Sequence, residues 1–223
     1  AAALKQVDTA EYNPLEAIKT NIIGAENVIK AAIQNSVEKV MALSTDKAAN
    51  PINLYGATKL CSDKLFIAAN NYTGNRKVSF SITRYGNVIG SRGSVMHVFN
   101  KQAKSNLFTI THPEMTRFWI SIEDGVSFAF ENLNRMIGGE IFIPKIPSVK
   151  ILDLAKAFNS KPKIKFIGLR PGEKIHETLL PKDSSHHSIE FKNHYIIYPE
   201  FIFKNINAKK YFINKKKEKG KKV

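Results

Sequence analysis

Tyr55 and Lys59 are the residues whose types and spacing most directly suggest chemistry, because they match the pattern Y-x-x-x-K. A separation of four residues places both side chains on one face of a helix, about one turn apart. A tyrosine with an ordinary pKa of about 10 is a poor base at neutral pH, whereas a neighbouring ammonium group favours its deprotonated form. The pair therefore predicts a tyrosine that takes a proton from a hydroxyl group. Tyr211 and Lys215 match the same spacing in a lysine-rich stretch, and we interpret that match as chance.

The elements around Tyr55 are those of an α/β protein. Apolar residues recur at helical spacing within residues 14–35, which predicts one helix. Residues 39–44 form a short apolar run, typical of a strand buried on both faces of a parallel sheet. A helix over about residues 55–74 and an alternating strand over residues 77–85 follow. This alternation predicts a doubly wound parallel sheet, in which ligands bind beyond the strand ends, where Tyr55 lies.

Beyond Gly93 the predicted elements become shorter and less regular. Helices are expected at residues 121–138 and 148–158, strands at 140–144 and 164–169, and a turn that opens a helix at 170–174. These units predict a smaller α/β lobe packed on the main sheet. The chain has 223 residues, 43% of them apolar, which is enough for one sizeable core and such a lobe.

The net charge of +15 raises the question of a nucleic-acid or membrane partner. Much of this charge lies in residues 204–223, which hold nine lysines and one acid. Because these lysines lack an interleaved aromatic stack or a base-reading motif, we interpret the segment as a basic, disordered tail and expect neither partner. The sequence contains no secretory signal and no run of about eighteen apolar residues, so we expect a cytoplasmic protein.

Residues that bind metals or form disulfides are sparse. Cys61 is the only cysteine, so no internal disulfide can form. Its place in an apolar helical stretch predicts a small core residue rather than a nucleophile. His186 and His187 lie in a polar loop without a cysteine or a third ligand nearby, so we expect no metal site.

Four segments of the chain resemble one known family, in the same order. They are residues 44–59 (STDKAANPINLYGATK), 84–95 (RYGNVIGSRGSV), 115–120 (MTRFWI) and 170–174 (RPGEK). The family is that of the UDP-N-acetylglucosamine 4,6-dehydratases (inverting), which start pseudaminic acid synthesis, and the resemblance extends from Ala1 to about Pro199. It implies an extended short-chain dehydrogenase/reductase, with an NADP-binding Rossmann core and a C-terminal lobe that holds the UDP-sugar.

The resemblance also implies an internal redox cycle on the sugar. Hydride leaves C4 for the nicotinamide, water is eliminated across C5 and C6, and hydride returns to C6, so that the cofactor is regenerated in each turnover. Oxidation at C4 acidifies the C5 proton, and the elimination then needs a base at C5 and an acid for the C6 hydroxyl. By resemblance, Tyr55 acts at O4, Lys47 takes the C5 proton and Asp46 protonates the C6 hydroxyl. Thr45 is a hydrogen-bonding helper.

Asp46 and Lys47 must both be uncharged to act in this way, whereas an ordinary adjacent pair is charged at neutral pH. Burial favours the neutral form of both groups. Positive charge from Lys59 and from the oxidised nicotinamide also favours a neutral lysine, but it opposes a neutral acid. The alternative interpretation is a surface ion pair of little energetic value.

Further binding residues follow from the resemblance. In addition to Tyr55, the cofactor-binding residues are Lys59, Lys5, Asn21 and Val88, and the substrate-binding residues are Asn87, Arg92, Arg117, Arg170 and Glu173. The arginines are suited to clamp the diphosphate with bidentate hydrogen bonds. The alternatives are a solvated or structural role for each arginine and a turn position for the asparagine that follows the strand.

The sequence lacks the glycine-rich turn that holds a dinucleotide pyrophosphate and normally lies in the first βαβ unit. We therefore expect an incomplete Rossmann-like fold that lacks about its first quarter, and weak NADP binding by the chain as written. The expected division is residues 1–93 for the C-terminal part of the NADP-binding domain, 94–203 mainly for the substrate-binding lobe with returning core elements, and 204–223 for the tail. The resemblance further implies a homo-oligomer.

Two other interpretations of the function are open at this point. A UDP-sugar 4-epimerase shares the roles of Tyr55 and Lys59 but needs no base at C5 and no acid at C6, so Asp46 and Lys47 favour the dehydratase. An inactive fragment or a basic binding module is favoured by the missing glycine-rich unit and by the lysine-rich tail.

Overall fold

The computed structural model describes residues 3–91, 93–199 and 221–222, which form three sheets with helices around them. The main sheet has the strand order β1-β2-β6-β10-β9-β11. These strands are β1 (Lys39–Thr45), β2 (Ser79–Tyr85), β6 (Ile141–Pro144), β10 (His194–Ile197), β9 (Ser188–Glu190) and β11 (Lys221–Lys222). β1, β2 and β6 run parallel, whereas β10, β9 and β11 pair in antiparallel fashion. The predicted α/β class with parallel core strands is confirmed, within a sheet that is mixed as a whole.

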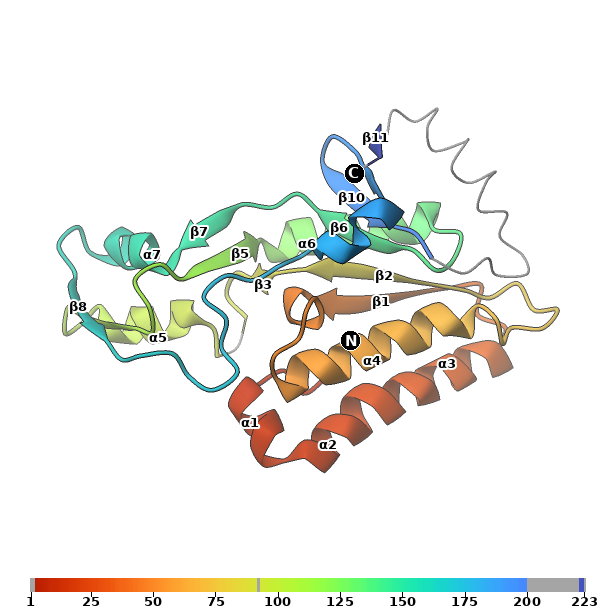
Figure 1. Cartoon of the computed structure of the whole chain (residues 1–223), viewed down its shortest axis with the longest axis horizontal. Helices are drawn as coiled ribbons and strands as arrows, with labels where there is room; N and C mark the ends of the chain where they lie inside the picture. Colours follow the sequence, from red (N-terminus) through yellow and green to blue (C-terminus); the bar gives the residue numbers. More distant parts are fainter. Residues whose placement is uncertain (1–2, 92, 200–220, 223) are drawn as a thin grey trace.

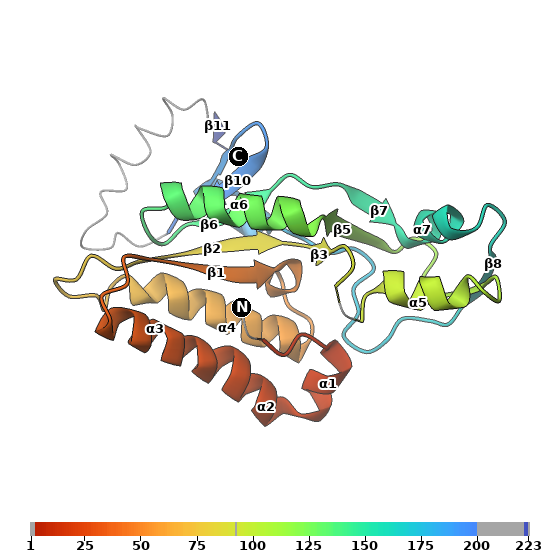
Figure 2. The same cartoon turned by 180° about the vertical axis from the view of Figure 1, so that it is seen from behind.

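Helices cover both faces of this sheet (Figures 1 and 2). The helices on the faces are α3 (Gly24–Gln34), α4 (Leu54–Ala69) and α6 (Ile122–Arg135), while α1 (Val7–Tyr12) and α2 (Pro14–Ile18) pack against α4. α3 and α4 lie on one face, and α6 lies on the other. A π-helical turn, Lys19–Ile23, joins α2 to α3, so the helix predicted over residues 14–35 is continuous but widened in its middle.

Position in the sheet decides how deeply each strand is buried. β2 lies between β1 and β6, and residues 80–84 are all buried. β1 has a strand on one side only among the described residues, and Ser44 is its one buried residue. Helices α4 and α6 cover the two faces of β1, as predicted for residues 39–44, but no described strand pairs with its outer edge, so most of its residues are only half-buried. A cavity lies beside that edge.

A smaller group of elements extends from one end of the main sheet (Figure 1). It consists of a three-stranded sheet of β3 (Asn87–Val88), β5 (Thr116–Ile120) and β7 (Ser148–Lys150), the pair β4 (Leu107–Ile110) and β8 (Lys163–Phe166), and the helices α5 (Val95–Gln102) and α7 (Ile151–Phe158). Phe99, Phe108 and Trp119 pack in its core. β6, β9 and β10 return to the main sheet from the same part of the sequence. The domain boundaries drawn at residues 93 and 203 stay predictions.

Two local predictions are wrong. Cys61 is exposed rather than buried, because α4 turns Ser62 and Asp63 toward the sheet and Cys61 toward solvent. No helix follows the turn at residues 170–174. The Ile175 carbonyl accepts hydrogen bonds from the Thr116 amide and the Arg117 guanidinium, so it is engaged by β5 rather than by a helical turn.

The lysine-rich tail lies largely outside the described residues. Residues 204–220 and 223 are not described, and this includes Tyr211 and Lys215. Lys221 and Lys222 form β11 and pair with Glu190 and Ile189 of β9. The prediction that the whole tail is disordered is therefore wrong at these two positions, because they complete an edge of the main sheet.

Candidate active site

The link between β1 and α4 carries the candidate catalytic residues. β1 runs directly into a 3₁₀ turn, Asp46–Ala48. Asn53 caps α4 by accepting a hydrogen bond from the Gly56 amide (2.7 Å). Gly56 is required because a Cβ at this position would collide with the carbonyl oxygen of Lys47. The first turn of α4 therefore lies directly on the 3₁₀ turn, which brings Tyr55 to the end of β1.

Thr45, Asp46 and Lys47 converge on one carboxylate oxygen beside Tyr55. The Thr45 hydroxyl donates to Asp46 Oδ1 (2.9 Å), and Lys47 Nζ donates to the same oxygen (3.1 Å). The side chain of Thr45 also lies close enough to that of Tyr55 to affect its pKa. Asp46 is fully buried, and its Oδ2 has no hydrogen-bond partner among the described residues. The four residues with predicted catalytic roles thus form one connected cluster.

Burial dominates the protonation of Tyr55 and Lys59. It raises the pKa of Tyr55 to about 12; the side chain of Thr45 acts in the opposite direction, and the charges of Asp46 and Asp63 add to the rise. Burial also lowers the pKa of Lys59, against the effect of Asp63. Lys59 Nζ donates to the Leu43 carbonyl oxygen of β1 (2.9 Å). The pKa of Tyr55 is therefore raised here, not lowered as the Y-x-x-x-K pattern predicts.

Arg117 and Arg170 meet at Glu173. Glu173 Oε1 lies 3.0 Å from Arg170 Nη2 and 3.6 Å from Arg117 Nη2. Burial raises the pKa of Glu173, but hydrogen bonds from Arg170 and the charges of both arginines outweigh it, so that its pKa lies below the ordinary value. Arg117 is buried, whereas Arg170 is 59% exposed and also lies 3.8 Å from Asp8 Oδ2. The predicted diphosphate residues therefore share one partner, and Arg170 presents the more accessible guanidinium.

The segment that follows Arg170 docks on the catalytic link. Asn53 Nδ2 donates to the Gly172 carbonyl oxygen (2.7 Å), and Lys174 Nζ donates to the Ala49 carbonyl oxygen (2.8 Å). Glu177 Oε1 lies 3.4 Å from Lys47 Nζ. Sequence reasoning missed Glu177, and no local pattern signals it, because the contact joins segments far apart in the chain.

Four other predicted binding residues lie away from the catalytic cluster in the sequence. Asn87 and Val88 form β3 and pair with Trp119 and Ile120 of β5. Lys5 is exposed near the start of α1. Arg92 lies outside the described residues. Their roles toward a cofactor or substrate stay predictions.

Asn21, another predicted cofactor residue, is buried and engaged within the protein. Its Oδ1 accepts from the Leu4 amide, and its Nδ2 donates to the Leu4 carbonyl oxygen and to Thr58 Oγ1. The side chain therefore ties the segment before α1 to α4. Its contact with a cofactor stays a prediction.

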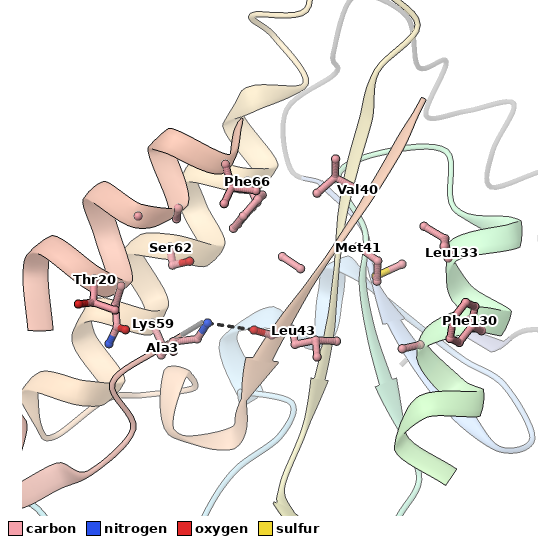
Figure 3. Close-up of a pocket in the computed structure, with 16 residues that line it drawn as sticks. Ala3, Thr20, Val40, Met41, Leu43, Lys59, Ser62, Phe66, Phe130 and Leu133 are labelled. Atoms are coloured by element: carbon pink, nitrogen blue, oxygen red, sulfur yellow. Dashed lines mark hydrogen bonds between the residues drawn. The ribbon is translucent and has the colours of Figure 1, made fainter. Parts of the chain in front are cut away.

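A cavity of about 420 Å³ lies along the outer edge of β1 (Figure 3). Lys59, Ser62 and Phe66 line it from α4, and Phe130 and Leu133 line it from α6. Figure 3 shows Lys59 reaching across toward β1. An apolar lining with a few polar groups is typical of a small-molecule site.

Two kinds of site are not found in the described part of the chain. Residues 3–91, 93–199 and 221–222 contain no cluster of three or more histidine, cysteine or acidic side chains that could hold a metal ion. None of the helices within these ranges is both long and apolar enough to cross a membrane.

Several known proteins are similar to this chain. It is 57% identical to UDP-N-acetylglucosamine 4,6-dehydratase (inverting) from Campylobacter jejuni over its full length, which is 67% of that protein. It is 47% identical to UDP-glucose 4-epimerase from Rickettsia bellii, over 98% of this chain and 65% of that protein. The X-ray structure of Pen from Bacillus thuringiensis matches 93% of this chain and 66% of that chain, with 38% identity and a TM-score of 0.86. The chain thus spans about two thirds of the length of these relatives.

The parallel strands β1, β2 and β6 with helices on both faces define an α/β fold of the Rossmann type, which the match to the structure of Pen supports. The family model described as polysaccharide biosynthesis protein matches residues 1–199. The chain belongs to this polysaccharide biosynthesis protein family, and its predicted resemblance to the inverting UDP-N-acetylglucosamine 4,6-dehydratases is confirmed.

Proposed function

We propose that the chain carries the catalytic and substrate-binding part of a nucleotide-sugar 4,6-dehydratase, a lyase that converts UDP-N-acetylglucosamine to a UDP-4-keto-6-deoxy sugar with inversion at C5. The observation that carries the proposal is the cluster beside Tyr55, in which Lys47 Nζ lies 3.1 Å from Asp46 Oδ1. An elimination needs a base and an acid next to the group that acts on the neighbouring hydroxyl, and this cluster supplies all three. The identity of 57% to the Campylobacter jejuni dehydratase supports the assignment.

In the proposed mechanism each catalytic residue accepts or donates one particular proton. Tyr55 takes the proton of the O4 hydroxyl in its deprotonated form, which the positive charge of Lys59 is proposed to favour against the effect of burial. Lys47 Nζ takes the C5 proton, and Asp46 gives its proton to the departing C6 hydroxyl, with Thr45 orienting the Asp46 carboxyl group through their hydrogen bond. The buried Oδ2 of Asp46 is free of described partners and is the atom on which we place that proton.

The diphosphate of the UDP-sugar is proposed to bind at Arg170 and Arg117, with Arg92 assisting and Asn87 contacting the sugar. Glu173 holds the two arginines next to each other. Paired guanidinium groups suit a diphosphate because each can make two parallel hydrogen bonds to its oxygens. The segment that carries Arg170 also contacts the catalytic link, so diphosphate and sugar are bound by one connected surface.

The proposed cofactor is NADP, which supplies the acceptance and return of hydride. Lys59 and Asn21 line the cavity beside β1, and its largely apolar wall fits the nicotinamide end of such a cofactor. Lys59 Nζ, which donates one hydrogen bond to the Leu43 carbonyl oxygen, is the polar group proposed to face it. Tyr55, Lys5 and Val88 are proposed to complete this surface. The sequence contains no G-x-G-x-x-G turn, so the proposal for this chain concerns the nicotinamide end of the cofactor. Titration with NADP and NAD separates the two cofactors.

A UDP-sugar 4-epimerase is the second candidate, because the chain is 47% identical to the Rickettsia bellii epimerase. An epimerase also uses the tyrosine and the lysine of α4 but leaves the C5 proton in place. An inactive fragment or a basic binding module is the third candidate. It rests on the missing glycine-rich turn and on the lysines of residues 204–223.

One labelling experiment separates these candidates. The chain, both alone and joined to the N-terminal third of the Campylobacter jejuni relative, is incubated with UDP-N-acetylglucosamine and NADP in deuterated water. A dehydratase yields a 4-keto-6-deoxy product with deuterium at C5. Recovery of only the C4 epimer, with no label at C5, would establish the epimerase instead. Failure of both forms to react or to bind the UDP-sugar would favour the fragment.

We further propose a cytoplasmic homo-oligomer that provides the first intermediate for pseudaminic acid, with no nucleic-acid or membrane partner. The proposal rests on the resemblance and on the composition described above. Light scattering of the active form tests the oligomeric state, and cell fractionation tests the location. Accumulation of the labelled product in cells, with its loss on deletion, tests the pathway.

A further inference from the structure

Glu177 is a buried carboxylate that faces the proposed catalytic lysine. Its side chain is only 3% exposed, and it follows the segment that docks on the link between β1 and α4. Its Oε1 lies 3.4 Å from Lys47 Nζ, and its Oε2 lies 3.5 Å from Lys174 Nζ. Burying a carboxylate is costly unless cations or hydrogen bonds compensate for the lost water, so the position of Glu177 depends on these two lysines.

Two carboxylates therefore converge on the same amine. Lys47 Nζ donates to Asp46 Oδ1 from one side and is paired with Glu177 from the other. The Thr45 hydroxyl also donates to Asp46 Oδ1, so this oxygen accepts hydrogen bonds from both Thr45 and Lys47. If Asp46 carries a proton, as an acid for the C6 hydroxyl must, Glu177 is the remaining anionic partner of Lys47.

Lys174 holds Glu177 in this place. Lys174 Nζ donates to the Ala49 carbonyl oxygen, at the end of the 3₁₀ turn that contains Lys47. The same lysine pairs with Glu177 Oε2, at a distance that allows an ion pair but without a hydrogen bond. Lys174 and Glu177 thus form a short bridge from the substrate-binding segment to the catalytic turn.

We infer that Glu177 is a positioning residue that directs Lys47 Nζ toward the substrate and stabilises the ammonium group formed when Lys47 takes the C5 proton. The inference rests on the proposed function. In this step the C5–H bond breaks and its proton moves to Lys47 Nζ, while the electron pair forms the C5–C6 double bond. The C6–O bond breaks, and the hydroxyl leaves as water with the proton of Asp46. Glu177 stays anionic throughout and balances the new charge on Lys47.

The test uses Glu177→Gln and Glu177→Asp in the active form of the full chain defined by the labelling experiment. Glu114→Gln is the matched control, because Glu114 forms an exposed ion pair with Lys150. Three rates or affinities are measured: reduction of the nicotinamide in a single turnover, deuterium incorporation at C5, and UDP-sugar binding. For Glu177→Gln we expect C5 labelling to fall about 10- to 100-fold, within the range that acid–base groups contribute, with the other two readouts within about twofold. Glu177→Asp should recover part of the loss.

A measurement of Lys47 reactivity, which needs no enzymatic activity, tests this inference separately from the proposed function. The modification rate of Lys47 by acetic anhydride is followed by mass spectrometry, with Lys156 as an internal reference, because its exposed ion pair with Asp153 is altered in neither variant. Loss of its second carboxylate partner should make Lys47 several-fold more reactive in Glu177→Gln and leave it unchanged in Glu114→Gln. Equal Lys47 reactivity in the parent and Glu177→Gln would overturn the inference whether or not the parent is a dehydratase. A uniform loss of all three activity readouts would show a purely structural role and would also overturn it.

Discussion

Replacing Lys47 with methionine removes the amine but keeps the length and the apolar stem of the side chain. Asp46 Oδ1 then loses one of its two hydrogen bonds and keeps the one from Thr45. Glu177 loses one of its two cations and keeps Lys174. In the chain without substrate, where Lys47 pairs with both groups, the substitution removes one partner from each of two buried carboxyl groups. It also removes the proposed base at C5.

The size of the stability loss follows from these contacts. A hydrogen bond to a charged group contributes about 1.5–3 kcal/mol, and a buried charge that loses a partner costs more than an exposed one. Because each carboxylate keeps one partner, we expect Lys47→Met to lower the free energy of unfolding by about 3 kcal/mol. In the double variant Lys47→Met/Asp46→Asn the fully buried carboxylate becomes a neutral amide, so the loss should fall to about half of that value.

Urea unfolding of both variants and of the parent measures these differences. In the active form, C5 labelling should fall at least about 100-fold in the single and the double variant alike, because both lack the base. Reduction of the nicotinamide in a single turnover should survive in Lys47→Met, since it depends on Tyr55 and Lys59. Product formation within about tenfold of the parent would show that Lys47 is not the base. Equal unfolding free energies for the two variants would refute the electrostatic argument.

Three further changes test other parts of the site. Tyr55→Phe should abolish reduction of the nicotinamide. It should also remove the contribution of Tyr55 to the pH dependence of the free energy of unfolding. Because the pKa of Tyr55 is about 12 in the folded chain and about 10 ordinarily, its stabilisation is present below about pH 10 and is lost as pH rises toward 12. Urea unfolding between pH 9 and about 12 checks this, and an unchanged slope would contradict it. Arg170→Ala should weaken UDP binding about tenfold in calorimetry while changing stability by about 1 kcal/mol, because the Arg170 guanidinium is largely exposed and Glu173 keeps Arg117 as a partner. Unchanged affinity would remove Arg170 from the diphosphate site. Gly56→Ala should destabilise the chain by about 2 kcal/mol or more and lower C5 labelling. The reason is that the Cβ of the new alanine would collide with the Lys47 carbonyl oxygen, so the catalytic turn must shift. Stability equal to that of the parent would show that the turn adapts freely.

Much of the core fold and the catalytic cluster could be predicted because the determinants are local. The apolar run of β1, the alternation of β2 and the periodicity of the helix before them are set by which neighbours along the chain share a face. Tyr55 and the residues at the end of β1 are separated by one short link. Their proximity therefore follows from the strand–turn–helix connection and needs no distant contact.

Other predictions failed because burial depends on what packs from elsewhere. Cys61 lies in an apolar stretch of α4, but the orientation of the helix on the sheet exposes it. β1 has the apolar run of a central strand and helices on both faces, but it is an edge of the sheet that the structure describes, so most of its residues are half-buried. The turn at residues 170–174 reads as a helix start, but β5 engages the carbonyl group of Ile175.

The sequence by itself determined the α/β class, the position of Tyr55 and Lys59 on one helix and the identity of the residues beside them. Only the tertiary structure decided the protonation of Tyr55, the convergence of Arg117 and Arg170 on Glu173, and the contact between Glu177 and Lys47. Helical spacing and strand alternation are properties of neighbouring residues, whereas desolvation and ion pairing depend on groups that distant segments bring together. The packing of the segment after Arg170 against the end of β1 is such an arrangement, and it sets the charge around the proposed base.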